Sequence, residues 1–177
     1  MSNPLRQPRT SLKLAVSAVF GALVFVATYS FVVSIPATSG YFNLGETVIF
    51  TGALVFGPLV GALSGGIGAT IADGLLASQF APGTLLIKGF EGAIVGYLNL
   101  KLQKYTSNRT LSGALAASVG GLEMVTGYFL YEQIALGYPL AATLAEVPLN
   151  LVQMAVGLIV AIPVMHAILQ VFPQLKS

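Results

Sequence analysis

The amino-acid sequence predicts an all-α integral membrane protein with six transmembrane helices and both termini in the cytoplasm. Three features support this fold class: an apolar composition, a series of long apolar segments, and basic residues confined to one side of the predicted membrane. Of the 177 residues, 55% are apolar and only 8% are charged, and the mean hydropathy is +0.85. Soluble domains carry about 25% charged residues. This composition therefore excludes a soluble enzyme.

The apolar segments form six candidate spans in a single transmembrane domain at residues 1–177. A membrane helix requires about 20 predominantly apolar residues. The expected spans are 11–33, 44–56, 59–77, 83–102, 111–131 and 140–171. The second is short for a full span and is separated from the third by Gly57-Pro58, which predicts a tight turn between two helices.

The orientation follows from the lysines and arginines, because basic loops near membrane segments stay in the cytoplasm. Seven basic residues fall on one side of a six-helix arrangement: Arg6, Arg9, Lys13, Lys101, Lys104, Arg109 and Lys176. The loops on the other side, at 36–43, 78–82 and 132–139, carry no lysine or arginine. A count of five or seven helices would place some of these charges on the wrong side. We therefore expect cytoplasmic tails at 1–10 and 173–177 around a six-helix core at 11–172.

Several kinds of chemistry are excluded by missing residue types. The chain has no cysteine and one histidine, so it offers neither a thiolate site nor a multi-histidine metal cage. It also lacks the G-x-x-x-x-G-K-[ST] motif that cradles nucleotide phosphates. We expect no cofactor, no metal, no catalytic residue and no nucleic-acid partner. Any ATP-driven work would need other subunits.

Small residues line one face of several predicted helices, where they allow close approach of another backbone. On the first helix Ala18 and Ala22 form such a face, either for packing within the protein or for docking of a partner. The glycines Gly57, Gly61, Gly65, Gly92 and Gly96 recur at four-residue spacing on the third and fourth helices. For these glycines internal packing is the favoured interpretation.

Polar residues within the last three spans predict a cavity open to the outside, because ionisable groups in hydrocarbon require partners or water. Lys88 and Glu91 are three residues apart, close enough for an ion pair on one helix face. Glu146, Asn150 and Gln153 follow at offsets of four and three, which places them on one stripe of the last helix. Glu123 and Tyr128 lie on the fifth. The alternative is a set of structural polar contacts that join the helices.

Two further acids, Glu46 and Asp73, lie nearer the outer ends of their helices, where we expect them to be solvated.

An intramembrane serine hydrolase of the rhomboid type is the alternative function. Ala62-Leu63-Ser64-Gly65 falls one residue short of the Gly-x-Ser-Gly of rhomboid proteases, and His166 could act as the base. The missing first glycine and the lack of a recognisable oxyanion site argue against it.

Four stretches carry a family resemblance: YFNLGE at 41–46, FGPLVGA at 56–62, GGIGATIAD at 65–73 and PGTLLIKG at 82–89. They resemble the substrate-binding (S) components of energy-coupling factor (ECF) vitamin transporters, closest to the riboflavin-transporter-like branch. The resemblance implies a multi-pass protein of a prokaryotic cell membrane, in contact with membrane lipid. Such a protein captures a vitamin under its first external loop and topples against a coupling transmembrane subunit driven by two ATPases.

The resemblance also assigns expected roles to individual residues. Family members dock through an Ala-x-x-x-Ala face on helix one, which Ala18 and Ala22 match. The expected substrate-binding residues are Tyr41, Phe42, Asn43, Lys88, Glu91, Glu123, Tyr128, Glu146, Asn150 and Gln153. The excess of acids over lysine in this set favours a neutral or cationic ligand rich in donors, such as an aminopyrimidine. Riboflavin or a pyridoxine-type ring stays open, because the aromatic residues could stack on a flat ring.

Overall fold

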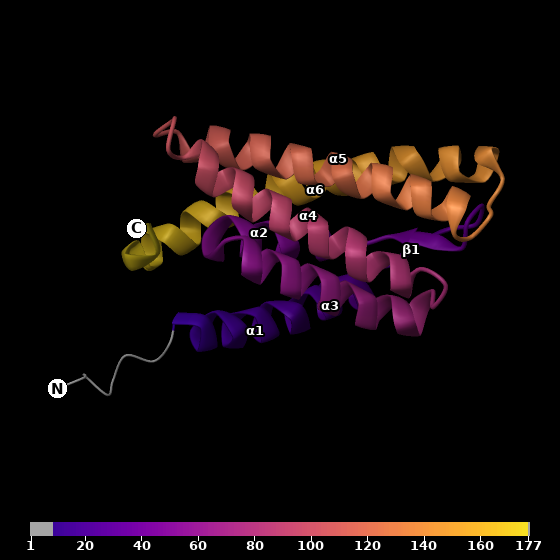
Figure 1. Cartoon of the computed structure of the whole chain (residues 1–177), viewed down its shortest axis with the longest axis horizontal. Coiled ribbons are helices and arrows are strands. Elements are labelled where there is room, and N and C mark those ends of the chain that lie inside the picture. The colour runs from indigo at the N-terminus through magenta and orange to yellow at the C-terminus, as the bar shows by residue number, and fades with distance from the viewer. Residues whose placement is uncertain (1–8, 177) are drawn as a thin grey trace.

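The computed structural model describes residues 9–176, and the side chains of residues 10–175. In this part of the chain the elements are α1 (Arg9–Ser30), β1 (Val33–Ile35), β2 (Gly40–Phe42), α2 (Gly45–Phe56), α3 (Pro58–Leu76), α4 (Ala81–Leu102), α5 (Arg109–Ile134), α6 (Leu140–Val171) and the 3-10 helix η1 (Pro173–Lys176). The helices form a bundle with one small hairpin at its end (Figure 1). The predicted all-α class is therefore confirmed.

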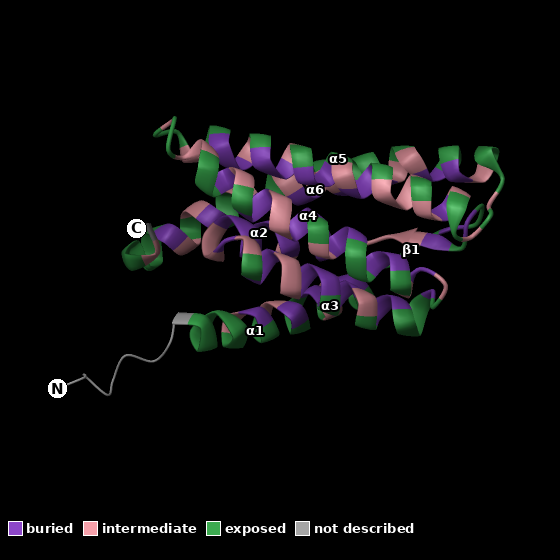
Figure 2. Ribbon diagram, viewed as in Figure 1, coloured by how far each residue is buried: buried purple, intermediate pink, exposed green. Residues whose placement is uncertain are grey.

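Four of the described helices, α1, α3, α5 and α6, are long and apolar enough to cross a membrane. The 12-residue α2 is shorter, and α4, which carries Lys88, Glu91 and Lys101, is not among the four. Exposed residues lie along the outward faces of the helices (Figure 2). Many are large and apolar, such as Leu75 and Ile159, each 67% exposed. A surface of this kind requires lipid around it, so the chain is a multi-pass membrane protein.

The two ends of the bundle differ in charge. The start of α1, the α4–α5 turn and η1 lie at one end, and the β1–β2 hairpin and the α5–α6 connection lie at the other (Figure 1). The first, which we call the basic end, carries Lys13, Lys101, Lys104 and Arg109. Arg6 lies outside the described residues, as do the side chains of Arg9 and Lys176. The second is called the hairpin end below.

The hairpin replaces part of the predicted first helix and its loop. The first helix was expected to continue to Val33, but α1 ends at Ser30 and residues 33–35 pair antiparallel with 40–42. Pro36 cannot donate a ladder hydrogen bond, and the chain reverses just after Ile35, whose carbonyl accepts from the amides of Thr38 and Ser39 (3.3 and 3.0 Å). The β-branched Val33 and Ile35 suit the short strand.

The close contact between α3 and α4 depends on glycine, as the four-residue spacing predicted. A Cβ atom added to Gly61 would collide with the carbonyl oxygen of Gly92, and one added to Gly92 would collide with the backbone of Gly61. Gly96 meets the backbone of Gly57 and Pro58 in the same way. The internal-packing interpretation of these glycines is confirmed.

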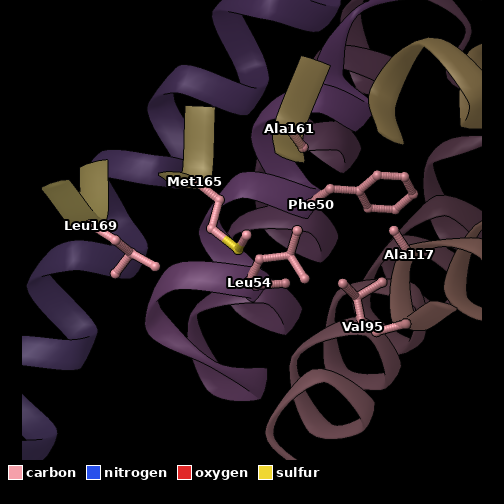
Figure 3. Close-up of a cluster of buried hydrophobic side chains, with 9 residues drawn as sticks. Phe50, Leu54, Val95, Ala117, Ala161, Met165 and Leu169 are labelled. Atoms are coloured by element: carbon pink, nitrogen blue, oxygen red, sulfur yellow. The ribbon is translucent and has the colours of Figure 1, made fainter. Parts of the chain in front are cut away.

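An apolar cluster fills the centre of the bundle between α2, α4, α5 and α6. Phe50, Val95 and Met165 are fully buried in it, and Leu54 packs with them (Figure 3). Phe50 lies one helical turn after Glu46 on α2. The cluster therefore forms an apolar floor beneath the polar residues at the hairpin end.

We predict that Gly61→Ala destabilises the protein by about 1 to 3 kcal/mol, because the added methyl group overpacks the α3–α4 contact. Gly74→Ala is the matched control on the same helix, since nothing lies within 4 Å of a Cβ there; it should be neutral or slightly stabilising. Thermal unfolding of the detergent-purified variants measures both. Equal melting temperatures for the two variants would contradict this account of the helix contact.

Candidate functional site

A narrow polar cavity of about 30 Å³ lies at the hairpin end, under the β1–β2 hairpin. It is lined by Gly40, Tyr41, Asn43, Asp73, Phe80, Lys88, Tyr128, Glu146, Asn150 and Gln153. Seven of the ten residues predicted from the sequence are among them. The structure thus brings together side chains from the hairpin, α3, α4, α5 and α6.

A buried ion cluster lies at the centre of the site. The Lys88 ammonium on α4 forms an ion pair with Glu46 at the start of α2. It also lies 3.1 Å from a carboxylate oxygen of Glu91 on its own helix. The predicted Lys88–Glu91 pair is confirmed. All three side chains are at most 4% exposed.

The expectation that Glu46 would be solvated is wrong. The first turn of α2 lies against α6, where Gly157 leaves room for the Glu46 side chain: a Cβ on Gly157 would come within 2.8 Å of it. Gln153 of α6 approaches the same carboxylate at 3.5 Å. The position of Glu46 along its helix does not predict this burial.

Asp73 is also buried rather than solvated, with 6% of its surface exposed. Its carboxylate accepts hydrogen bonds from the hydroxyls of Tyr41 and Thr84. Thr84 in turn lies 2.9 Å from the Tyr128 hydroxyl, which therefore donates to it. Burial and the Asp73 carboxylate raise the pKa of the Tyr41 hydroxyl in the hairpin above its ordinary value, so this group stays protonated and donates.

The polar stripe on α6 faces the cavity as its spacing predicted. Glu146, Asn150 and Gln153 are each at most 5% exposed. Glu146 accepts a hydrogen bond from the Thr38 hydroxyl, and the Gln153 carbonyl accepts one from the backbone N–H of Asn43 at 2.8 Å.

Three polar contacts therefore hold the hairpin over the cavity: Thr38 to Glu146, Tyr41 to Asp73, and the Asn43 amide to Gln153. Gly40 lets the hairpin approach α6, because a Cβ there would lie 2.8 Å from both Glu146 carboxylate oxygens. The hairpin therefore covers the site, and its polar groups occupy hydrogen-bond acceptors on α3 and α6.

Three predicted site residues do not line the cavity. Phe42 packs against Phe31 with ring centroids 6.1 Å apart. Glu91 is fully buried beside Lys88. Glu123 is half-buried on α5, and one of its carboxylate oxygens is buried without a hydrogen-bond partner among the described residues.

Sequence reasoning missed Glu132, which was expected in the loop 132–139. The helix α5 continues to Ile134, so Glu132 lies one turn after Tyr128 on the same helix face. It is 1% exposed, and neither carboxylate oxygen has a hydrogen-bond partner among the described residues. Its carboxyl group interacts electrostatically with that of Glu146. The four-residue spacing from Tyr128 was the available signal.

Ala18 and Ala22 lie far along the chain from these residues, at a separate groove between α1 and α3. The groove has a volume of about 510 Å³ and is lined mainly by apolar side chains, including Phe25, Leu63 and Ile67. Both alanines are exposed.

The small residues beside them, Ser17 and Gly21, are buried, and a Cβ on Gly21 would lie 3.8 Å from Ser64 of α3. Internal packing therefore uses Ser17 and Gly21, whereas Ala18 and Ala22 stay accessible.

The residues considered for a hydrolase do not form a catalytic pair. Ser64 is fully buried and donates to the carbonyl of Gly61 in its own helix at 3.3 Å. His166 lies 2.9 Å from the Thr110 hydroxyl on α5. The rhomboid interpretation has no support from this geometry.

The fold and the site define a multi-pass membrane protein that gathers buried polar side chains under a hairpin at one end. Comparison with known proteins then gives the family. A family model described as "ECF-type riboflavin transporter, S component" matches residues 9–170. The chain belongs to this family, as the sequence motifs indicated, and its function is that of a non-enzymatic substrate-capture subunit for a vitamin or vitamin precursor.

Two relatives extend the comparison. An "Uncharacterized protein in gap 3'region" of Pyrococcus woesei is 37% identical over 137 residues, which cover 77% of this chain and 88% of the relative. The "Thiamine precursor transporter HmpT" of Lactococcus lactis subsp. cremoris is 29% identical over 152 residues, covering 84% of this chain and 82% of the relative.

We predict that Lys88→Met lowers the free energy of unfolding by about 3 to 5 kcal/mol, because it leaves buried carboxylates without their counterion. Adding Glu46→Gln should restore part of the loss. Lys101→Met, at an exposed lysine on the same helix, is the control and should change little. Denaturant or thermal unfolding in detergent measures the effect, and a Lys88→Met protein as stable as the control would disprove the central role of the ion cluster.

Proposed function

We propose that this protein captures a small, donor-rich heterocycle of the aminopyrimidine type at the outer face of a prokaryotic cell membrane. Delivery requires an ECF coupling transmembrane subunit and two ATPases. The chain crosses the membrane six times with both termini in the cytoplasm, and the described lysines and arginines other than Lys88, all at the basic end, support this orientation.

The excess of acidic over basic residues at the site is the observation on which the proposed substrate class rests. The chain has six acidic residues, and all of them lie in or around the site: Glu46, Asp73, Glu91, Glu123, Glu132 and Glu146. The one lysine among them, Lys88, is already paired with Glu46 and Glu91. An anionic ligand would meet uncompensated carboxylates, whereas a cationic or amine-bearing ligand supplies the donors that they lack.

The proposed binding residues match the edge of an aminopyrimidine. An exocyclic amine donates to a carboxylate such as Glu146, and a ring nitrogen accepts from an amide such as that of Asn150 one helical turn away. Tyr128 and Phe80 line the same cavity and can pack against the ring face. The naming of HmpT as a thiamine precursor transporter also supports this class.

The hairpin must move for the ligand to enter. The cavity of about 30 Å³ has room for little more than a water molecule, while sites for small molecules occupy about 300 to 1,000 Å³. Lifting the hairpin would free the acceptor groups of Asp73, Glu146 and Gln153. We propose that these groups then bind the ligand with Asn150, with Tyr41 and Asn43 closing over it.

Riboflavin is the second candidate. The aromatic side chains of Tyr41, Phe80 and Tyr128 line the cavity and could stack on a flavin ring. Against it, a large tricyclic ring needs a greater displacement of the hairpin than a single pyrimidine does.

Isothermal titration calorimetry of the purified chain tests the proposal. The panel contains the hydroxymethyl-aminopyrimidine half of thiamine, thiamine, pyridoxine and riboflavin. We expect submicromolar affinity for the aminopyrimidine, without added ATP, and weaker binding of riboflavin. Preferential binding of riboflavin would select the second candidate, and a folded protein that binds none of the four would overturn the proposed substrate class.

Substitutions of single residues in the cavity test the proposed binding roles individually. Glu146→Gln and Asn150→Leu should each weaken binding by about 1 to 3 kcal/mol, because a buried polar group of the ligand loses its partner. Gln170→Leu, on the exposed face near the other end of α6, is the control and should bind as the unmodified protein does. Unchanged affinity in both pocket variants, with the fold intact, would assign these residues a structural role.

Docking is separable from capture, because Ala18 and Ala22 lie on α1, away from the cavity. We predict that Ala18→Trp or Ala22→Trp abolishes co-purification with the coupling subunit and vitamin uptake, since the bulky ring blocks close approach of a partner helix. Ligand affinity should stay within about twofold. Ala155→Trp, at an exposed alanine on α6, is the control. A tryptophan variant that still assembles and transports would show that this face is not the docking surface.

A further inference from the structure

A second cavity, much larger than the first, lies at the basic end of the bundle. It has a volume of about 490 Å³ and is formed by α1, the α2–α3 turn, α4, the start of α5, α6 and η1. Its walls are mainly apolar, with Val16, Leu54, Leu100 and Leu169 among them. A cavity of this size is within the range of small-molecule sites.

Two cationic side chains accompany these apolar walls. Lys13 lines the cavity from the first turns of α1, and Arg109 lines it from the first residue of α5. None of the lining residues is acidic. Apolar walls beside two cations suit an amphiphile with an anionic headgroup. A free anion would make no favourable contact with the apolar walls, and an uncharged lipid would make no ionic contact with the two cations.

The charge distribution of the whole chain strengthens this match. All six acidic residues lie in or around the Lys88 cluster, so the described part of the basic end holds Lys101 and Lys104 as well as the two lining cations but no acidic side chain. Basic pockets between membrane helices on the cytoplasmic side bind anionic lipid headgroups.

We propose that this cavity binds one anionic phospholipid of the cytoplasmic leaflet, with its phosphate at Lys13 and Arg109 and part of an acyl chain against the apolar walls. The proposal uses the membrane orientation given above but not the identity of the vitamin. A lipid in this place would join α1 to α5, α6 and η1. Because α1 packs chiefly on α3 and α2, the bound lipid would stabilise its cytoplasmic half.

Native mass spectrometry of the purified full chain tests the proposal, with phosphatidylglycerol and phosphatidylcholine of identical acyl chains added at equal concentration. We expect preferential retention of a single phosphatidylglycerol. Lys13→Gln and Arg109→Gln should each weaken its binding about fivefold, corresponding to ~1 kcal/mol per basic residue. Lys104→Gln, at an exposed lysine outside the cavity, is the matched control and should have no such effect.

Thermal unfolding supplies a second readout if a variant folds poorly. Phosphatidylglycerol should raise the melting temperature of the unmodified protein and of Lys104→Gln more than that of Lys13→Gln. Equal retention of the two lipids, or an equal effect of Lys104→Gln, would overturn the proposal.

Two other occupants are also tested. Glycerol 1-phosphate bound with the same dependence on Lys13 would show a simple anion site. Variants that keep phosphatidylglycerol but lose the coupling subunit would show a protein contact. Either result would overturn the phospholipid as the proposed occupant of this cavity.

Discussion

The buried ion cluster around Lys88 is the interaction on which the rest of the hairpin end depends. An unpaired ammonium at this depth would cost several kcal/mol, and Lys88 meets Glu46 of α2 and Glu91 of α4. Gln153 of α6 approaches the same Glu46 carboxylate and also holds the backbone of Asn43. The cluster therefore joins α2, α4 and α6, and Gln153 connects it to the hairpin.

The segregation of charge along the bundle separates two different environments. The acids gather around Lys88, and the other described basic residues lie at the opposite end. Between them lies the apolar cluster around Phe50 and Met165. A ligand with amine donors suits the first environment, and an anionic group suits the second. The charge distribution that supports the proposed membrane orientation thus also underlies the different ligands proposed for the two ends.

The sequence predicted what depends on short-range spacing and missed what depends on tertiary cover. The Lys88–Glu91 pair and the stripe of Glu146, Asn150 and Gln153 follow from helical periodicity, and the structure has both. The burial of Glu46 could not be predicted, because it depends on Lys88 of α4, on Gln153 of α6 and on the missing side chain at Gly157.

Asp73 and Glu132 were misjudged for a related reason. Asp73 is covered by Tyr41 of the hairpin, and Glu132 belongs to a helix that ends three residues later than its hydropathy indicated. The hairpin itself rests on a ladder of only three residue pairs, too few to leave a strand pattern in the sequence.

The closed cavity also bears on how a ligand is selected. Asp73, Glu146 and Gln153 each accept a hydrogen bond from the hairpin, so a ligand must replace these bonds before it gains affinity. A ligand shifts such an equilibrium only by the difference in its affinity for the two arrangements. A molecule that offers a flat ring alone would leave the freed carboxylates without donors, while one that offers amine donors would satisfy them. In the proposed mechanism the hairpin contacts therefore favour a donor-rich heterocycle, which replaces the lost hydrogen bonds, over an anion, which does not.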